Sequence, residues 1–125
     1  MARKKVLLVD DEVDFTRLVK MNLETTDKFE VMTLNSAKDI LTYVHQFAPD
    51  VILLDLLMSV MGGLEVCEIL NNDPIGKKIP VIIISALDKE TDKLKAYKLG
   101  IVAYLTKPME VDDIIHSIEK VLKFR

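Results

Sequence analysis

The sequence predicts a doubly wound α/β fold, in which helices cover both faces of a parallel sheet. Two observations lead to this prediction. Short apolar runs alternate five times with longer amphipathic segments along the 125 residues, as in repeated strand–helix units. Three of these runs are almost wholly apolar and rich in Val and Ile, which is typical of strands buried on both faces. Because crossovers between parallel strands are right-handed, the helices should lie on both faces of the sheet.

The five predicted strands differ in how apolar they are. The runs at 5–9, 51–55 and 80–85 contain almost only apolar residues, which suits the centre of the sheet. The run at 29–34 is mixed and the run at 102–105 is short, with polar residues on both sides. We therefore expect these two strands at the edges of the sheet.

Five helices are predicted from apolar residues spaced at i, i+3, i+4 and i+7, a spacing that gives a helix one buried face. Ser36 followed by Asp39, and Asp88 near Asp92, resemble helix starts. The fourth stripe is less clearly apolar than the others. The predicted stripes are Phe15, Leu18, Val19 and Leu23; Ala37, Ile40, Leu41, Val44 and Ala48; Leu64, Cys67 and Leu70; Leu87, Thr91, Leu94 and Tyr97; and Val111, Ile114, Ile115, Ile118 and Leu122.

Composition indicates a single domain, because 125 residues are enough for one core and too few for two. A formal net charge of −3 argues against a nucleic-acid-binding module. Cys67 is the only cysteine, so no intrachain disulfide can form, which fits a reducing compartment. No apolar run approaches the roughly 18–20 residues that span a bilayer, and the start of the chain does not resemble a signal peptide. These features predict a cytoplasmic protein without a membrane partner.

The predicted strands end in polar side chains that carry chemistry. The first strand ends at Asp10, Asp11 and Glu12 follow it, and Asp55 ends the third strand. Ser85 ends the fourth strand, and Lys107 follows the fifth. Ligands of open α/β sheets bind at the carboxyl ends of the strands. The sequence thus predicts a site with at least three carboxylates, one hydroxyl and one ammonium group.

Such a site favours a divalent cation and a phosphoryl group. Two carboxylates about 4 Å apart repel by roughly 4 kcal/mol at an effective dielectric constant near 20, and a cation relieves that repulsion. Oxygen ligands favour Mg²⁺, Mn²⁺ or Ca²⁺ over zinc, and Mg²⁺ commonly shares its shell with a phosphate oxygen. Lys107 and Ser85 can contact the other phosphoryl oxygens. Asp55 is then the candidate nucleophile.

Four motifs, in order along the chain, resemble the receiver domain of bacterial two-component response regulators. They are V-D-D-E at 9–12, D-x-x-M-x-x-M-G-G at 55–63, S-A at 85–86 and Y-L-T-K-P at 104–108. The resemblance covers essentially the whole chain. It implies a flavodoxin-like sheet of five strands in the order 2-1-3-4-5 with five helices. It also implies that residues 1–125 form a single receiver domain with no output domain.

The resemblance implies a role for each site residue. Asp55 resembles the phosphoacceptor, which takes a phosphoryl group from a phosphohistidine. Asp10 and Asp11 resemble the acidic pair that binds Mg²⁺ together with Asp55 and the backbone carbonyl of Leu57. Lys107 resembles the lysine that pairs with the phosphoryl group.

Two further residues resemble the family's switch. Ser85 matches the switch hydroxyl and Tyr104 the switch aromatic, and in the family both move on phosphorylation. This motion reshapes the surface of the fourth helix, fifth strand and fifth helix, which a downstream protein reads. The implied phosphodonor is a sensor histidine kinase or a phosphotransfer protein. Direct nucleic-acid binding by this domain is not expected, and a phosphorylation-dependent dimer stays open. The family also commonly has a cis peptide bond before Pro108.

Leu57 and Leu87 depart from the family, which often has polar residues at these positions. Two leucines beside the site should shield an acyl phosphate from water, so we expect slow autodephosphorylation. The chain is accordingly expected to be a switch that catalyses its own phosphorylation, not a turnover enzyme.

The sequence disfavours three other functions. A phosphorylation-independent pseudo-receiver that only docks to partners is disfavoured by the intact set of Asp10, Asp11, Asp55 and Lys107. An aspartate-nucleophile phosphatase needs a second Asp two residues after the nucleophile, where this chain has Leu57. A flavin or nucleotide carrier lacks its Gly-rich phosphate loop after the first strand.

Overall fold

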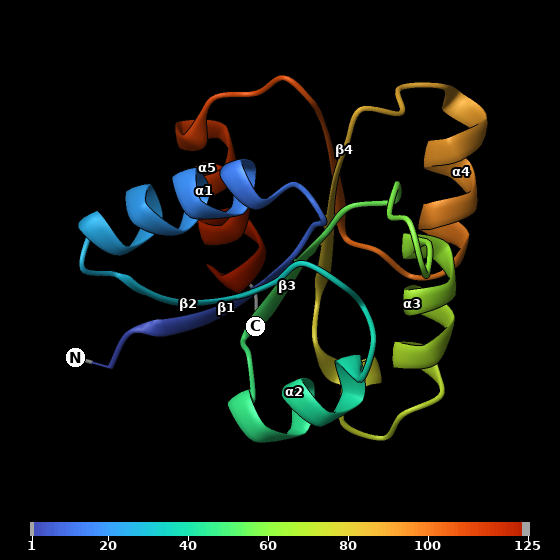
Figure 1. Cartoon of the computed structure of the whole chain (residues 1–125), viewed down its shortest axis with the longest axis horizontal. Helices are drawn as coiled ribbons and strands as arrows, with labels where there is room; N and C mark the ends of the chain where they lie inside the picture. Colours follow the sequence, from blue (N-terminus) through green and yellow to red (C-terminus); the bar gives the residue numbers. More distant parts are fainter. Residues whose placement is uncertain (1, 124–125) are drawn as a thin grey trace.

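A five-stranded parallel sheet forms the centre of the protein, and helices cover both of its faces (Figure 1). The computed structural model describes residues 2–123. The strand order is β2-β1-β3-β4-β5, which confirms the predicted fold class and order. The strands are β1 (Lys4–Val9), β2 (Phe29–Leu34), β3 (Val51–Leu54), β4 (Val81–Ser85) and β5 (Ala103–Thr106).

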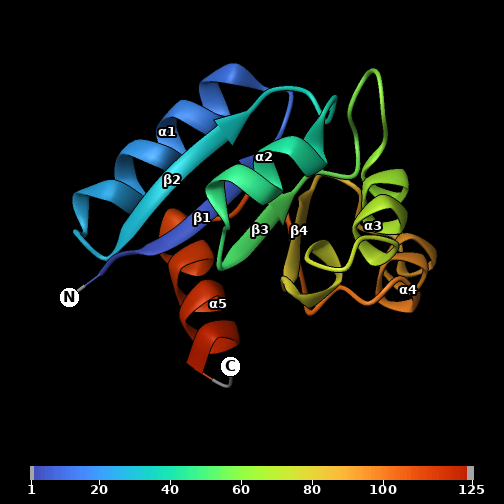
Figure 2. The same cartoon turned by 90° about the horizontal axis from the view of Figure 1, so that it is seen from below.

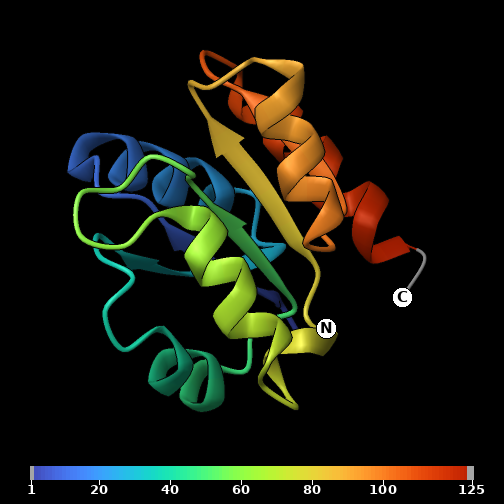
Figure 3. The same ribbon diagram turned by 90° about the vertical axis from the view of Figure 1, so that its right-hand side faces the viewer.

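The helices divide between the two faces of the sheet. Helices α1 and α5 lie together on one face, and α2, α3 and α4 lie on the other (Figures 1 and 2). A view from the side shows α3 and α4 next to each other across the sheet from α1 (Figure 3). Their bounds are α1 (Val13–Thr25), α2 (Ile40–Phe47), α3 (Gly63–Asn71), α4 (Glu90–Lys98) and α5 (Val111–Lys123), and a short 3-10 helix, η1 (Gly76–Lys78), precedes β4.

Side chains of the central strands alternate between two hydrophobic clusters. In β1, Val6 and Leu8 pack with α1 and α5, whereas Leu7 and Val9 pack with α2, α3 and α4. Each of these four side chains is at most 1% exposed. Burying one such side chain stabilises the fold by roughly 1.5–3 kcal/mol. This two-sided burial explains why the central strands read as continuous apolar runs.

The two mixed runs lie at the edges, as predicted, because β2 and β5 each pair with one neighbour only. Strand β5 begins at Ala103, one residue later than expected, and Val102 is exposed. The predicted bounds of the other strands agree with the structure to within one residue.

The predicted apolar stripe of the fourth helix was wrong. Helix α4 begins at Glu90, so Leu87 precedes it, and Leu94 and Tyr97 are exposed. The buried residue of this helix is Ala96, which is 0% exposed. Because this small side chain makes the core contact, the larger apolar residues are left facing solvent.

The predicted helix starts also differ from the structure. Helix α2 begins at Ile40, and the Ser36 hydroxyl accepts a hydrogen bond from the Lys38 N–H in the turn before it. Asp39 precedes α2 with a φ of 60° and makes no capping side-chain bond. Lys89, not Asp88, directly precedes α4. In the other four predicted stripes, Leu18 and Ala48 are exposed.

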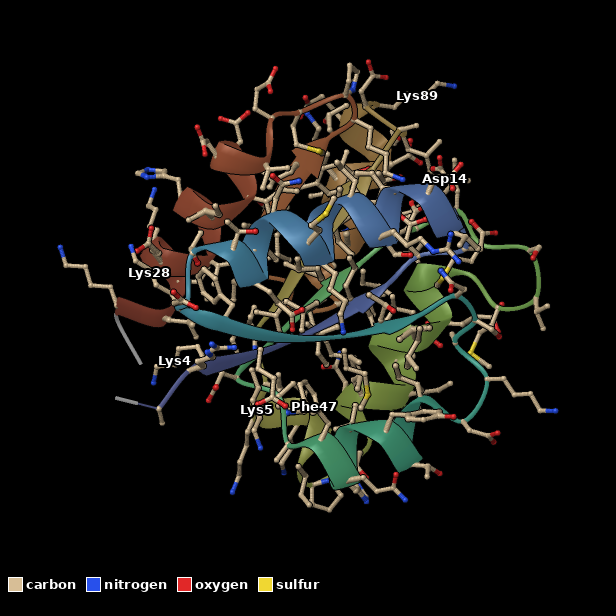
Figure 4. The ribbon with its side chains drawn as sticks, turned by 60° about the vertical axis from the view of Figure 1, so that its left-hand side comes forward. Lys4, Lys5, Asp14, Lys28, Phe47 and Lys89 are labelled. Atoms are coloured by element: carbon tan, nitrogen blue, oxygen red, sulfur yellow. The ribbon has the colours of Figure 1, made fainter. Side chains whose placement is uncertain are left out.

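Contacts at the far end of the sheet tie the helices to the strands. The Lys5 ammonium lies 5.5 Å from the centre of the Phe47 ring, and Figure 4 shows the two side chains together beside Lys4. The His45 Nε2 lies 2.9 Å from an Asp73 carboxylate oxygen, which also accepts the Gly76 N–H. The hydrogen bond to His45 is the main reason why the pKa of Asp73 is lowered.

Cys67 is a core residue, as its place on the third stripe predicted. Its side chain is 2% exposed, and burial raises the pKa of the thiol to about 11. The thiol is therefore protonated at neutral pH and unreactive. No helix within residues 2–123 has the length and apolar character needed to cross a bilayer.

Candidate functional site

The predicted site residues meet where β1, β3, β4 and β5 end. Asp10 directly follows β1 and Asp55 directly follows β3. Because these two strands are neighbours, with β2 outside β1, the two carboxylates lie side by side at the point where the strand order reverses. Ser85 is the last residue of β4, and Lys107 directly follows β5.

Three carboxylates converge at this point. Oxygen atoms of Asp10, Asp11 and Asp55 all lie within 4.8 Å of one another. Asp10 is 1% exposed and Asp55 4% exposed, whereas Asp11 is more open to solvent. A hard divalent cation such as Mg²⁺ takes oxygen ligands from such groups, so the donor set fits the expected metal.

Backbone N–H groups hold the three carboxylates in place. Asp10 Oδ1 accepts the Glu12 N–H at 2.9 Å, and Asp55 Oδ1 accepts the Leu57 N–H at 3.1 Å. Asp11 Oδ2 accepts the N–H of Ser59 at 3.2 Å, which links the β1–α1 loop to the β3–α3 loop. Each bond uses one oxygen of its carboxylate, and the other oxygen of Asp10, Oδ2, accepts a hydrogen bond from the Lys107 ammonium.

The Lys107 ammonium lies among these carboxylates. Its Nζ is 2.7 Å from Glu12 Oε1, 2.8 Å from Asp10 Oδ2 and 3.6 Å from Asp55 Oδ2. The centre of the Phe15 ring is 4.3 Å away. The structure therefore places the predicted lysine next to the predicted nucleophile.

The charges of this cluster alter its pKa values. Burial raises the pKa of the Asp55 carboxyl, and the nearby Asp10 carboxylate adds to the rise. The Leu57 N–H and the Lys107 ammonium oppose this change without cancelling it. Burial by itself would lower the pKa of Lys107, but its hydrogen bonds to Asp10 and Glu12 outweigh that effect and raise it. Lys107 thus stays cationic, and Asp55 is a more basic oxygen nucleophile than an exposed aspartate.

Ser85 and Tyr104 both contact the backbone of Leu87. The buried Ser85 hydroxyl accepts the Leu87 N–H at 3.2 Å. The half-buried Tyr104 donates its hydroxyl to the Leu87 carbonyl at 2.6 Å, and the Lys93 ammonium lies 5.7 Å from the centre of its ring. The β4–α4 loop therefore joins the two predicted switch residues. The peptide bond between Lys107 and Pro108 is cis, as the resemblance implied.

A comparison with known protein families identifies the family to which this chain belongs. The family model of the response regulator receiver domain matches residues 6–119. The chain is a response regulator receiver domain. This match confirms the resemblance that the four sequence motifs indicated, and receiver domains are signalling switches of two-component systems.

Relatives and solved structures agree with this family. The receiver domain is 37% identical over 117 residues to the heme response regulator HssR of Staphylococcus saprophyticus, covering 94% of this chain and 50% of HssR. The receiver domain spans about half the length of several curated relatives that it matches. Among solved structures it resembles the receiver domain of the Francisella response regulator 1452, with 30% identity, a TM-score of 0.88 and coverage of 97% of this chain and 98% of that one. The chemotaxis protein CheY4 of Vibrio cholerae gives 25% identity, a TM-score of 0.89 and coverage of 96% and 99%.

Three residues for which the sequence predicted no role make contacts at the site of this receiver domain. Glu12 and Phe15 both contact Lys107. The Asn35 side-chain amide donates to the Asp10 carbonyl and to the Thr16 hydroxyl, which ties the loop after β2 to the loop after β1. The position of Glu12 inside the first motif was the one sequence feature that pointed to a role at the site. The sequence pattern of Phe15 indicates only a core residue of α1.

Proposed function

We propose that this receiver domain is a phosphorylation-activated switch that accepts a phosphoryl group on Asp55 with the help of Mg²⁺. The observation that carries the proposal is the convergence of Asp10, Asp11 and Asp55 within 4.8 Å, with the Lys107 ammonium 3.6 Å from Asp55. The donor is a phosphohistidine of a sensor histidine kinase or of a phosphotransfer protein. A docking module that is never phosphorylated would have no need of this arrangement.

The chemistry is a transfer from nitrogen to oxygen. An Asp55 carboxylate oxygen attacks phosphorus and forms the new O–P bond while the P–N bond of the donor breaks. The electron pair of that bond goes to the imidazole nitrogen, which then takes a proton from water. Lys107 and Ser85 contact phosphoryl oxygens and hold the group during the transfer. Asp10, Asp11, Asp55 and the Leu57 carbonyl would hold Mg²⁺, which offsets the charge of the phosphoryl oxygens when it is bound.

The output is a change in the surface formed by α4, β5 and α5. Ser85 is the site residue that a phosphoryl group on Asp55 would attract, and it shares Leu87 with Tyr104 through the bonds described above. A groove of about 840 Å³ lies between β5 and α5, lined in part by Tyr104, Met109 and Val121. Movement of Tyr104 would therefore alter a surface that a downstream protein can read.

An assay with a small phosphodonor tests this function. The protein is incubated with Mg²⁺ and acetyl phosphate, and its intact mass is measured. We expect a gain of one phosphoryl group on the parent and none on Asp55→Asn, which has a similar shape but lacks the nucleophilic oxygen. An unmodified parent, or the same adduct on Asp55→Asn, would contradict the proposal and favour a phosphorylation-independent docking module.

The lifetime of the phosphoryl group is tested at Leu57. This side chain is 49% exposed beside Asp55, so it is placed to limit the approach of water to the acyl phosphate. We expect Leu57→Asn to lose its phosphoryl group faster than the parent, because a polar side chain there can hold an attacking water. The measurement is the decay of the phosphorylated mass after the donor is removed. A decay no faster than that of the parent would exclude the shielding role, and Val60→Asn, at an exposed position of the same loop, is the matched control.

A further inference from the structure

Two residues near the start of α1 hold the Lys107 ammonium, and the transfer described above does not use them. Glu12 Oε1 accepts a hydrogen bond from Lys107 Nζ at 2.7 Å. The Phe15 ring lies 4.3 Å from the same nitrogen. We propose that Glu12 and Phe15 are positioning residues, which orient Lys107 so that it meets the phosphoryl group and does not close on Asp55. This inference rests on the proposed phosphorylation of Asp55.

A lysine at this place needs to be oriented. Its ammonium is a point charge on a flexible stem, so side-chain geometry alone does not aim it. A close pair with Asp55 would stabilise the free carboxylate and so oppose its attack on phosphorus. In the structure Nζ lies 3.6 Å from Asp55 but within 2.8 Å of both Asp10 and Glu12. The ammonium thus lies closer to Asp10 and Glu12 than to the nucleophile.

The number of donors agrees with this role. A lysine ammonium has three N–H donors. Asp10 and Glu12 accept two of them, which leaves the third for a phosphoryl oxygen. The face of the Phe15 ring attracts the cation without taking a strong hydrogen bond. Phe15 is itself partly buried and packs against the hydrophobic cluster between the sheet and helices α1 and α5, so packing restricts the position of its ring.

Local structure leaves Glu12 free for this contact. Its N–H donates to Asp10, and its carbonyl accepts the Thr16 N–H at 3.1 Å, so its backbone is anchored. Its side chain makes no capping bond to α1. Phe15 lies in the first turn of α1, and its ring and the Glu12 carboxylate both reach the Lys107 ammonium.

The exposure of Glu12 makes it possible to distinguish a role in orienting Lys107 from a role in stabilising the fold. The Glu12 side chain is 62% exposed, and exposed ion pairs add little to the stability of a fold. Loss of Glu12 should therefore change the rate of phosphorylation much more than the resistance to urea. A merely structural role would change them together.

The experiment measures the rate of phosphorylation by acetyl phosphate from intact mass. We expect Glu12→Ala and Phe15→Leu to be about three- to tenfold slower than the parent, because the lysine is less well placed. Phe15→Tyr keeps the ring and should stay within about twofold of the parent. Asp14→Asn is the matched control, because Asp14 is an exposed acid in the same turn that forms no ion pair with Lys107, and its rate should be unchanged (Figure 4).

A Lys107→Met background tests whether the two residues act through the lysine. There, Glu12→Ala and Phe15→Leu should cause no further loss. The inference is overturned if both single variants match the parent, if Glu12→Ala is faster, or if the losses persist in the Lys107→Met background. In each of these cases a parent phosphorylated on Asp55 leaves the proposed function standing. A parent that takes no phosphoryl group overturns both.

Discussion

Replacing Lys107 by methionine should lower the rate of Asp55 phosphorylation by about 100- to 1000-fold, the usual effect of removing one aimed donor from a site that stabilises developing charge. The ammonium lies 3.6 Å from Asp55 Oδ2 and the Lys107 side chain is 13% exposed, so water does not readily take the place of the ammonium. Methionine is an unbranched side chain that keeps most of the length of the lysine stem and removes only its charged end. The rate is measured with Mg²⁺ and acetyl phosphate.

Metal affinity separates this effect from general damage to the site. Removing a cation beside three carboxylates makes the site more negative, so Mg²⁺ should bind Lys107→Met at least as tightly as the parent. Calorimetric titration with Mg²⁺ provides the comparison. A variant that loses both the rate and the metal would indicate a collapsed site, and an unchanged rate would exclude the lysine from the transfer.

Replacing Gly63 by alanine should lower the free energy of unfolding by about 2–3 kcal/mol, a cost typical of forcing an extra methyl group into a packed region. Gly63 is the first residue of α3. A Cβ there would lie 2.5 Å from the Asp55 carbonyl oxygen and 2.7 Å from the Leu56 Cα. Both are backbone atoms, so the strain can be relieved only by moving the helix or the segment that carries the nucleophile. Urea denaturation measures the loss, and slower phosphorylation should accompany it.

Gly62 is the matched control for Gly63. A Cβ on Gly62 would approach only the Leu56 carbonyl oxygen, at an ordinary 3.6 Å, and its φ of −73° suits alanine. Gly62→Ala should therefore change the free energy of unfolding by no more than about 0.5 kcal/mol. Equal urea midpoints for the two variants would contradict the close approach of Gly63 to the backbone of Asp55 and Leu56, which follow β3.

Sequence reasoning predicted the strands well because their signal is local. Burial on both faces requires apolar residues at nearly every position of a central strand. The runs that form β1, β3 and β4 meet this requirement and can be recognised in the sequence. The prediction from the sequence was wrong for the buried face of α4, where Ala96 is buried and Leu94 is exposed. The side of a short helix that faces the sheet depends on the path of the loop that leads into the helix. The periodic pattern of apolar residues does not specify that path.

The same division applies to the candidate site. Asp10, Asp11, Asp55, Ser85 and Lys107 could be named because each stands at the end of a predicted strand, and parallel strands bring such ends to one edge. Glu12 and Phe15 could not be assigned to Lys107, because they lie 95 and 92 positions away along the chain.

The order of residues by itself therefore determined the layered fold, its two edge strands and the group of acids and one lysine at one edge. Those features follow from burial and from the polarity of strand ends, which each segment expresses alone. Only the tertiary structure decided that the Lys107 ammonium lies between Glu12 and Asp10, beside the Phe15 ring. The ammonium is farther from Asp55 than from these two carboxylates. That choice among competing anions is a matter of distances between segments, which exist only after the chain has packed.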